Sequence, residues 1–374
     1  MIYLDYSATT PVDKQVLETF NKVSLDFIGN PNSLHKLGVK AKELEISATK
    51  QIKELLKLKN HEIIYTSGSS ESNNLAIKGI CLKHQGIGKH IITTNLEHSS
   101  IYGPIGYLQK QGYTVDFVKT KNGLVDMEDL KKILRNDTVL VTIASVNSET
   151  GVLQNIEEIA KFLKDKNCYF HVDMTQSIGK VNINFDNIDL VSFSAHKIYG
   201  LKGIGCLIKK DNIIIEPLIH GGKSTTIYRS GTPALPLIAS LSKALRLSLT
   251  DLDKKYQYVE KLNEKLKKEL EKFKNVRINS NKNSIPHILN ISVLNSKPET
   301  FQHALEEYDI YISTQSACST NNPISKAVYE VTKNEESARH SIRISLSSLT
   351  TEEELQKFME AFLNCYNKFD NLKG

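Results

Sequence analysis

The sequence lacks the features that mark membrane, secreted or zinc-binding proteins. No apolar run approaches the ~20 residues needed to cross a bilayer, and the first residues carry neither a basic segment nor a long apolar one. We therefore expect no export signal and no membrane association. The five cysteines form no Cys-x-x-Cys pair and no disulfide framework. This pattern predicts a reducing compartment, the cytoplasm, and no metal site.

Arginine is also scarce, with six residues against 42 lysines. Because lysine supplies most of the positive charge, each arginine is a better candidate for a role that needs the planar guanidinium group. Arg343 lies in an alternating run, 341–346, which places it on the face opposite Ile342 and Ile344. We therefore mark Arg343 as a candidate functional residue.

The net charge of +6 is small for 374 residues. Lysines alternate with glutamates, as in 261–272, which is typical of a solvated helix with i,i+4 ion pairs. The modest basic bias could help an acidic partner or a tRNA approach, but solubility explains it equally well. We expect no direct binding of nucleic acid.

The chain is longer than a single hydrophobic core supports, so two domains are expected. From 62 to about 210, short β-branched runs alternate with helical patterns, which predicts an α/β fold with a mainly parallel sheet between helices. Beyond about 235, lysine-rich helices precede a smaller α+β group. We predict a large domain over 13–250 and a small domain built from 1–12 and 251–374.

The stretch 189–208 organises this prediction. An apolar run ends at Ser-Ala-His-Lys, 194–197, and glycines follow at 200, 203 and 205 before a second apolar run. Lys197 thus lies where an interior strand meets a glycine-rich turn, a setting that suits a lysine forming a Schiff base with a carbonyl cofactor. A lysine that merely reaches from a strand end to water is the simpler interpretation. The neighbouring motifs must decide between the two.

Polar clusters follow four other predicted strands. Residues 66–73 open a helix with small hydroxyl side chains, which suits a phosphate but also an ordinary helix cap. Asp173 ends another strand, where it could keep a pyridine nitrogen protonated or simply cap a helix. His98 and Asn147 occupy equivalent turns. Since these strand ends meet at one crevice of an open α/β sheet, together they predict a single cofactor site.

Taken together, the chain resembles the cysteine desulfurases with a long catalytic loop, within the fold-type I, pyridoxal-phosphate-dependent enzymes related to class V aminotransferases. The resemblance extends almost end to end, and the motifs are specific only as a set. The motifs that carry it are Tyr-Leu-Asp-Tyr-Ser-Ala-Thr-Thr at 3–10, Gly-Asn-Pro-Asn-Ser at 29–33, Thr-Ser-Gly at 66–68, Glu-His at 97–98, His-Val-Asp at 171–173, Ser-Ala-His-Lys at 194–197, Arg-Ser-Gly-Thr at 229–232 and Ser-Ala-Cys at 316–318.

This resemblance implies a large pyridoxal 5'-phosphate-binding domain and assigns roles around the cofactor ring. Lys197 would hold the cofactor covalently, and Asp173 would pair with the ring nitrogen. His98 would stack on the ring and assist proton transfer, while Gln176 would contact the ring oxygen. Asn147 would contact the ring oxygen and the substrate.

The resemblance also implies a phosphate site and a homodimer. Four residues would bind the phosphate, namely Ser69, Ser70, Ser194 and His196. Thr232 would reach the phosphate of the neighbouring subunit, so the active sites would be shared between two copies of the chain.

Two further residues would act on the substrate, L-cysteine. Arg343 matches the family arginine that binds the substrate carboxylate in a bidentate manner, through two parallel hydrogen bonds. Cys318 lies in a polar segment without apolar periodicity, within a loop of about 314–325 that the resemblance makes mobile. The other cysteines lie in apolar stretches and are expected to be core residues. Cys318 would attack the substrate sulfur and become a persulfide.

Two segments depart from the family pattern. Residues 223–228 replace a glycine- and glutamate-containing turn, and Gln315 stands where relatives often have glycine. The expected activity is L-cysteine to L-alanine with a persulfide on Cys318, which supplies sulfur to an acceptor protein for iron–sulfur cluster assembly or tRNA thiolation. Two alternatives stay open, namely another pyridoxal-phosphate aminotransferase or lyase, and a non-catalytic sulfur-relay or scaffold subunit.

Overall fold

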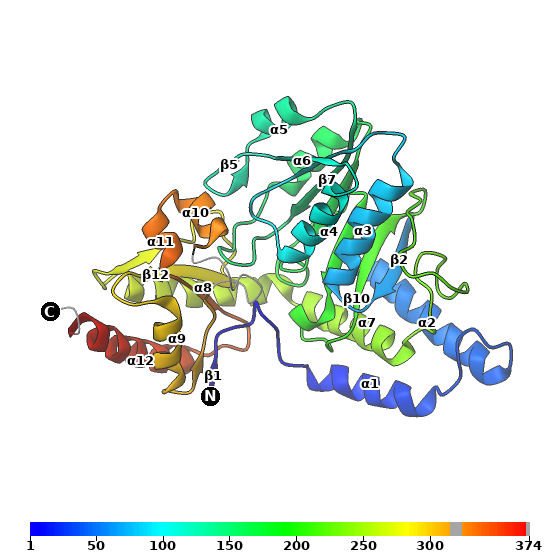
Figure 1. The fold of residues 1–374 in the computed structure, drawn as a ribbon. Coiled ribbons are helices and arrows are strands. Elements are labelled where there is room, and N and C mark those ends of the chain that lie inside the picture. Colours follow the sequence, from blue (N-terminus) through cyan, green and yellow to red (C-terminus); the bar gives the residue numbers. More distant parts are fainter. Residues whose placement is uncertain (315–323, 372–374) are drawn as a thin grey trace.

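The computed structural model describes residues 1–314 and 324–371. Figure 1 shows a large part built around one twisted sheet with helices on both faces, and a smaller part beside it that contains both chain termini. Cys318 and Gln315, and with them residues 315–323 of the segment predicted to be the catalytic loop, fall outside the described residues.

The large sheet has seven strands, and it is mainly parallel, as predicted. β10 is the exception, because it runs antiparallel to both of its neighbours, β2 and β9. The strands with polar sequences after them therefore all point the same way and end at the same edge of the sheet. In spatial order they are β2 His61–Thr66, β10 Gly205–Lys210, β9 Leu190–Ser194, β8 Tyr169–Asp173, β7 Thr138–Ala144, β3 His90–Thr93 and β4 Thr114–Phe117.

The sheet is covered on both faces. Successive side chains of a strand point to opposite sides of the sheet, so neighbouring residues pack in different clusters. Ile63 packs on one face and Ile64 on the other, each in its own hydrophobic cluster. One face is covered by α3 Ser69–Lys83 and α4 Ser99–Gln109; the other is covered by α2 Lys36–Leu55, α6 Ile156–Leu163 and α7 Leu235–Leu249. Smaller elements complete this part, namely α1 Lys14–Asp26, β5 Thr120–Lys121, β6 Leu124–Val125 and α5 Met127–Ile133.

The smaller part has its own core. Its strands form a three-stranded antiparallel sheet in the order β11–β12–β14, and β1 pairs in parallel with β13. Ile2 and Leu4 pack here with residues from 259 to 366, so the N-terminus belongs to this core. The elements are β1 Ile2–Tyr3, α8 Leu252–Leu270, β11 Val276–Ile278, β12 Ile288–Val293, α9 Pro298–Glu306, β13 Ile310–Tyr311, α10 Lys326–Thr332, α11 Glu335–Arg339, β14 Ser341–Ser345 and α12 Glu352–Asn371.

Local sequence signals explain how the last helix begins. The amide of Thr351 donates to Glu354 at 2.8 Å, and the amide of Glu354 donates to the Thr351 hydroxyl at 3.1 Å. This reciprocal pair is a capping box, which satisfies two amides at the start of the helix. Three cysteines are buried as expected, whereas Cys168 is only half-buried.

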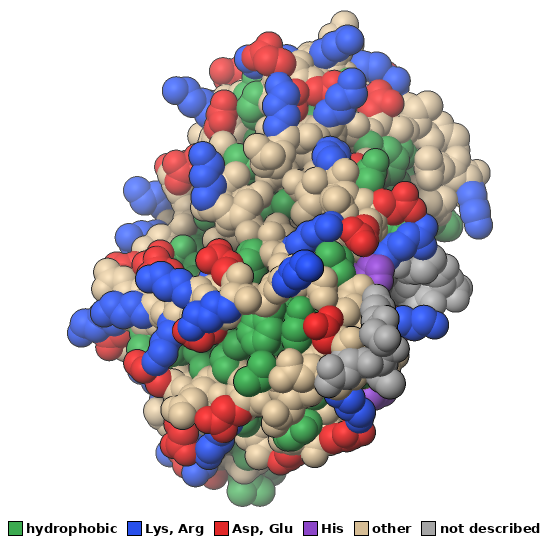
Figure 2. All heavy atoms as spheres, turned by 90° about the vertical axis from the view of Figure 1, so that its left-hand side faces the viewer, with side chains coloured by type: hydrophobic (Ala, Val, Ile, Leu, Met, Phe, Trp, Pro, Cys, Tyr) green, Lys and Arg blue, Asp and Glu red, His purple; other side chains and the backbone are tan. Residues whose placement is uncertain are grey.

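On the face of the smaller part, lysine and arginine side chains are interspersed with acidic ones, and no single basic area dominates (Figure 2). This distribution agrees with the interleaved lysines and glutamates of the sequence. Among the described helices, none combines the length and apolar character that a bilayer crossing requires.

Candidate active site

A cavity of about 250 Å³ opens at the carboxyl edge of the large sheet, where it meets the smaller part. Four elements of the large part contribute to it, namely α3, β7, β8 and the 3₁₀ turn after β9, together with β14 of the smaller part. Eight residues predicted from the sequence line it, namely Ser69, Ser70, His98, Asp173, Gln176, His196, Lys197 and Arg343. The fold therefore brings together side chains that are up to 274 positions apart in the sequence.

Lys197 lies in a short 3₁₀ turn, Ala195–Lys197, directly after β9. Its side chain is half-buried, and its Nζ donates to the backbone carbonyls of Ser7 and Ala8 at 2.5 and 2.7 Å. These carbonyls belong to the N-terminal segment that crosses from the smaller part. The amine thus faces the cavity in a partly desolvated setting, as a nucleophilic lysine requires.

Asp173 ends β8, lines the same cavity and is buried. One carboxylate oxygen accepts from the amide and hydroxyl of Thr175, and the other accepts from the Asn73 side chain at 2.8 Å. These donors fix the orientation of the carboxylate. Asn73 itself lies on α3, and its buried Oδ1 has no hydrogen-bond partner.

His98 caps α4, and its Nδ1 accepts from the Ser100 amide at 3.2 Å. Because a backbone N–H can only donate, the neutral ring carries its own proton on Nε2. Burial lowers the pKa of His98, and the negative charge of Asp173 opposes that effect. A neutral imidazole with a free N–H is suited to moving a proton near the cavity.

The N-terminus of α3 forms a second wall. Gly68 is the N-cap and provides no side-chain hydrogen bond, so the first amides of the helix remain available to an anion beside Ser69 and Ser70. Gly205 permits this arrangement, because a Cβ there would lie 2.7 Å from the Gly68 Cα. Burial and neighbouring lysines lower the pKa of His196 to about 4, so its ring is neutral near pH 7.

Arg343 reaches the cavity from β14 and is buried. Its Nη2 forms an ion pair with Asp5 at 2.8 Å, and its Nη1 donates to the carbonyl of Ser148 at 3.0 Å. Its Nε is buried without a hydrogen-bond partner. The guanidinium is therefore held through Nη1 and Nη2, while its Nε–H has no partner.

Three predicted residues within the described part do not line this cavity. Asn147 accepts from the amides of Glu149 and Thr150 in its own turn, and it donates to the carbonyl of the distant Leu96. Ser194 is buried at the end of β9, and Thr232 is exposed. Their proposed contacts with a cofactor stay predictions. So does the role of Cys318, for which the structure gives no position.

The residues present fit pyridoxal 5'-phosphate. A half-buried amine, a fixed carboxylate in the same cavity and an uncapped helix N-terminus match the aldehyde, the ring nitrogen and the phosphate of that cofactor. The partnerless Asn73 and Arg343 atoms add donor and acceptor capacity beside them. Within the described residues, no cluster of histidine, cysteine and carboxylate side chains could hold a metal ion.

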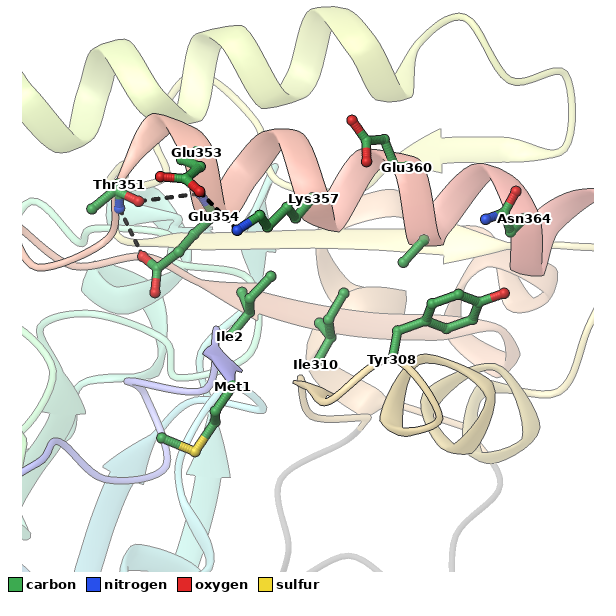
Figure 3. Close-up of a pocket in the computed structure, with 11 residues that line it drawn as sticks. Met1, Ile2, Tyr308, Ile310, Thr351, Glu353, Glu354, Lys357, Glu360 and Asn364 are labelled. Carbon is green, nitrogen blue, oxygen red and sulfur yellow. Dashed lines mark hydrogen bonds and ion pairs between the residues drawn. The ribbon is translucent and has the colours of Figure 1, made fainter.

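Another hollow, of about 590 Å³, lies on the smaller part (Figure 3). Figure 3 shows Ile2 and Ile310 between α12 and α9, with acidic side chains of α12 above them. Glu353 already pairs with Lys357, and Glu354 caps the helix. None of the predicted site residues lines this hollow, so we assign the candidate site to the sheet-edge cavity.

Sequence reasoning missed several residues of the site. Asp5 orients Arg343, and Lys180 donates to Gln176 from behind the cavity wall. The only available signal for Lys180 was its position four residues after Gln176. Asp5 lies in a quoted motif, but nothing in that motif indicates a partner in β14.

Comparisons with known proteins agree with this geometry. A model of the family "Aminotransferase class-V" matches residues 2–358. A NifS/IcsS protein homolog of Lactobacillus delbrueckii subsp. bulgaricus is 40% identical, covering 100% of this chain and 99% of that protein. The cysteine desulfurase IscS of Buchnera aphidicola subsp. Acyrthosiphon pisum is 41% identical, covering 95% and 90%. A solved structure of a NifS-like protein from Rickettsia africae has a TM-score of 0.87 and 33% identity, covering 98% and 99%.

The chain therefore belongs to the class-V aminotransferase family. Within that family, it belongs to the cysteine desulfurases of the IscS and NifS kind. The resemblance inferred from the sequence motifs is confirmed.

Proposed function

We propose that this chain is a pyridoxal-phosphate-dependent cysteine desulfurase that converts L-cysteine to L-alanine and carries the sulfur as a persulfide on Cys318. The observation that supports it most directly is the shared cavity of Lys197 and Asp173, closed on one side by an uncapped helix N-terminus. Lys197 would bind the cofactor aldehyde, Asp173 its ring nitrogen, and α3 with Ser69 and Ser70 its phosphate. When bound, the cofactor supplies an electron sink for carbanion chemistry.

The substrate would be oriented by Arg343. Its Nε is the donor left without a partner, and Asp5 holds the rest of the guanidinium in place. A carboxylate at this point would hold the substrate in the cavity that Lys197 also lines. Lys197 would then move the Cα proton, and His98 would exchange a proton through its Nε2.

The sulfur step uses Cys318. Its thiolate would attack the sulfur of substrate cysteine, forming an S–S bond while the C–S bond of the substrate breaks. The carbon fragment keeps the electron pair of that bond and, after protonation, leaves as alanine. Atoms balance without another oxidant, because one thiol and one cysteine give one persulfide and one alanine. The delivery of this thiol by a long catalytic loop belongs to the proposal.

We further propose a cytoplasmic homodimer that passes its sulfur to an acceptor protein, for iron–sulfur cluster assembly or tRNA thiolation. Exposed apolar side chains on α1, on α2 and between them support a dimer, because a monomer would leave them in water. Leu25 and Ile28 are each 77% exposed, and Leu34 is 97% exposed. Thr232 is also exposed, which suits a residue that reaches the neighbouring site.

A Cys318→Ser variant tests this function. We expect it to retain cofactor binding, seen as visible absorption that borohydride bleaches, and to lose L-cysteine-dependent alanine and persulfide formation. The matched control is Cys168→Ser, which removes a half-buried cysteine outside the site and should leave turnover intact. Full desulfurase turnover in Cys318→Ser would refute the role of Cys318. A colourless wild-type protein that binds no pyridoxal phosphate would refute the function as a whole.

A further inference from the structure

Lys180 is a buried lysine that ordinary packing does not explain. It lies in the turns after β8, and only 8% of its surface is exposed. No carboxylate of the described residues pairs with it; its Nζ donates to the side-chain oxygen of Gln176 at 2.8 Å. An ammonium group buried against one neutral acceptor is costly, and an apolar side chain would fill the space at lower cost.

The contact with Gln176 fixes the orientation of that amide. Because a lysine amine donates to an oxygen, the amide oxygen must face Lys180 and the NH₂ group must face the other way. That NH₂ donates to the carbonyl of Ser7 at 2.9 Å, the same carbonyl that accepts from Lys197. Gln176 and Lys197 both line the cavity, whereas Lys180 does not. Lys180 therefore affects the cavity wall through its hydrogen bond to Gln176.

The surroundings of Lys180 are positively charged. Lys197 faces it from the 3₁₀ turn and Arg343 from β14. Burial lowers the pKa of Lys180 to about 7, and those two charges contribute to the shift. His196 and His287 also lie near, and burial lowers their pKa values to about 4 and about 3, so both are neutral at pH 7. Asp5, which pairs with Arg343, and Asp173 on the cavity wall offset part of this positive charge, and an anion in the cavity would offset more of it.

We propose that Lys180 is a positioning residue of the cofactor site: it holds the Gln176 amide with its NH₂ toward the cavity, and its positive charge strengthens binding of the anionic cofactor. This inference rests on the proposed function, since it takes pyridoxal phosphate as the anion. Lys180 takes up a proton as the anion binds, because a nearby negative charge favours its charged form.

The first experiment measures the affinity of the full-length, cofactor-free protein for pyridoxal phosphate. Lys180→Met should weaken binding about tenfold at pH 7, the effect of one unit charge about 10 Å away at an effective dielectric constant of ~20. Lys180→Arg, which retains the donor and the charge, should stay within about threefold of wild type. The control is Lys209→Met, because Lys209 is equally buried but pairs with Glu62 away from the cavity. It should bind the cofactor as wild type does.

The second experiment measures proton uptake on cofactor binding, by calorimetry in buffers of different ionisation enthalpy. Wild type should take up a fraction of a proton between pH 7 and 8, and Lys180→Met should lose that uptake. In a Gln176→Leu background, the effect of Lys180→Met on affinity should shrink, because part of it acts through the amide. Wild-type affinity and proton uptake in Lys180→Met would overturn this inference while leaving the proposed function intact. Absence of binding by wild type would instead refute the proposed function.

Discussion

At the scale of single residues, the chemistry of the cavity depends on buried polar side chains, some of which have hydrogen-bond partners for only part of their polar atoms. Glu97 precedes His98 and is buried, accepting from the Thr94 hydroxyl at 2.6 Å and from the Ala144 amide at 2.9 Å. Burial raises the pKa of Glu97 from 4.5 to about 8, and the nearby Asp173 adds to the rise. Glu97 is therefore protonated in the folded protein at neutral pH, although no sequence pattern indicates it.

This protonation makes stability depend on pH. Below about pH 4.5, folded and unfolded chains both hold the Glu97 proton; between 4.5 and 8 only the folded chain does, so this contribution to stability is lost as pH rises. Glu97→Gln keeps a neutral side chain at every pH. Its melting temperature, measured without cofactor, should therefore fall less than that of wild type from pH 5.5 to 8.5. Exposed Glu18 gives the control Glu18→Gln, and parallel curves for wild type and Glu97→Gln would contradict the shift.

At the scale of elements, the site depends on how closely β10 approaches the start of α3. At Gly205, an added Cβ would lie 2.6 Å from the Phe193 carbonyl oxygen and 2.7 Å from the Gly68 Cα, both of them backbone atoms. The antiparallel direction of β10 matters here, because it brings the beginning of that strand to the edge where its neighbours end. The glycine-rich turn after Lys197 thus positions the lysine, and through Gly205 it also allows the start of α3, the predicted phosphate site, to lie close to β10.

We expect Gly205→Ala to push the start of α3 away from β10. The affinity of the cofactor-free protein for pyridoxal phosphate should fall about tenfold or more, and the free energy of unfolding should fall by about 1–3 kcal/mol, the usual cost of overpacking. Gly86→Ala is the control, because a Cβ at that exposed position meets nothing within 4 Å. Unchanged affinity in Gly205→Ala would show that the helix start does not hold the phosphate.

At the scale of the whole molecule, the N-terminal segment joins the two parts across the site. β1 pairs in the smaller part, and the carbonyls of Ser7 and Ala8 then accept from Lys197 in the large part. Arg343 of β14 meets Asp5 of the same segment. The division into domains at 13–250 and the remainder stays a prediction. Figure 1 also shows α1 and α2 extending from the large part, where they carry the exposed apolar residues.

These apolar residues lead to a prediction about assembly. Changing Ile28 and Leu34 together to glutamate should convert the homodimer to monomer, because charges would be buried in the interface. Sedimentation velocity on the purified protein should show the change, and desulfurase activity should fall if Thr232 serves the neighbouring site. Exposed Leu363, on α12, provides the control Leu363→Glu. A dimer that survives the double substitution would place the interface elsewhere.

The sequence by itself determined much of this protein. Period-2 and period-3.6 patterns placed the main strands and helices, and strand-end motifs marked Lys197, Asp173 and His98, because local backbone preference and side-chain burial act over a few residues. Short elements such as α5, with seven residues, and α11, with five, were not predicted, because so few residues show too little periodicity.

Only the tertiary structure decided which groups share a cavity and what state they are in. The burial of Lys180 behind Gln176, the pairing of Asp5 with Arg343 and the protonation of Glu97 arise from contacts between distant segments. Asn147 shows the same limit, because its side chain is occupied by the amides of its own turn and by the distant Leu96 carbonyl. Desolvation and charge depend on everything packed around a group, and no local pattern encodes that environment.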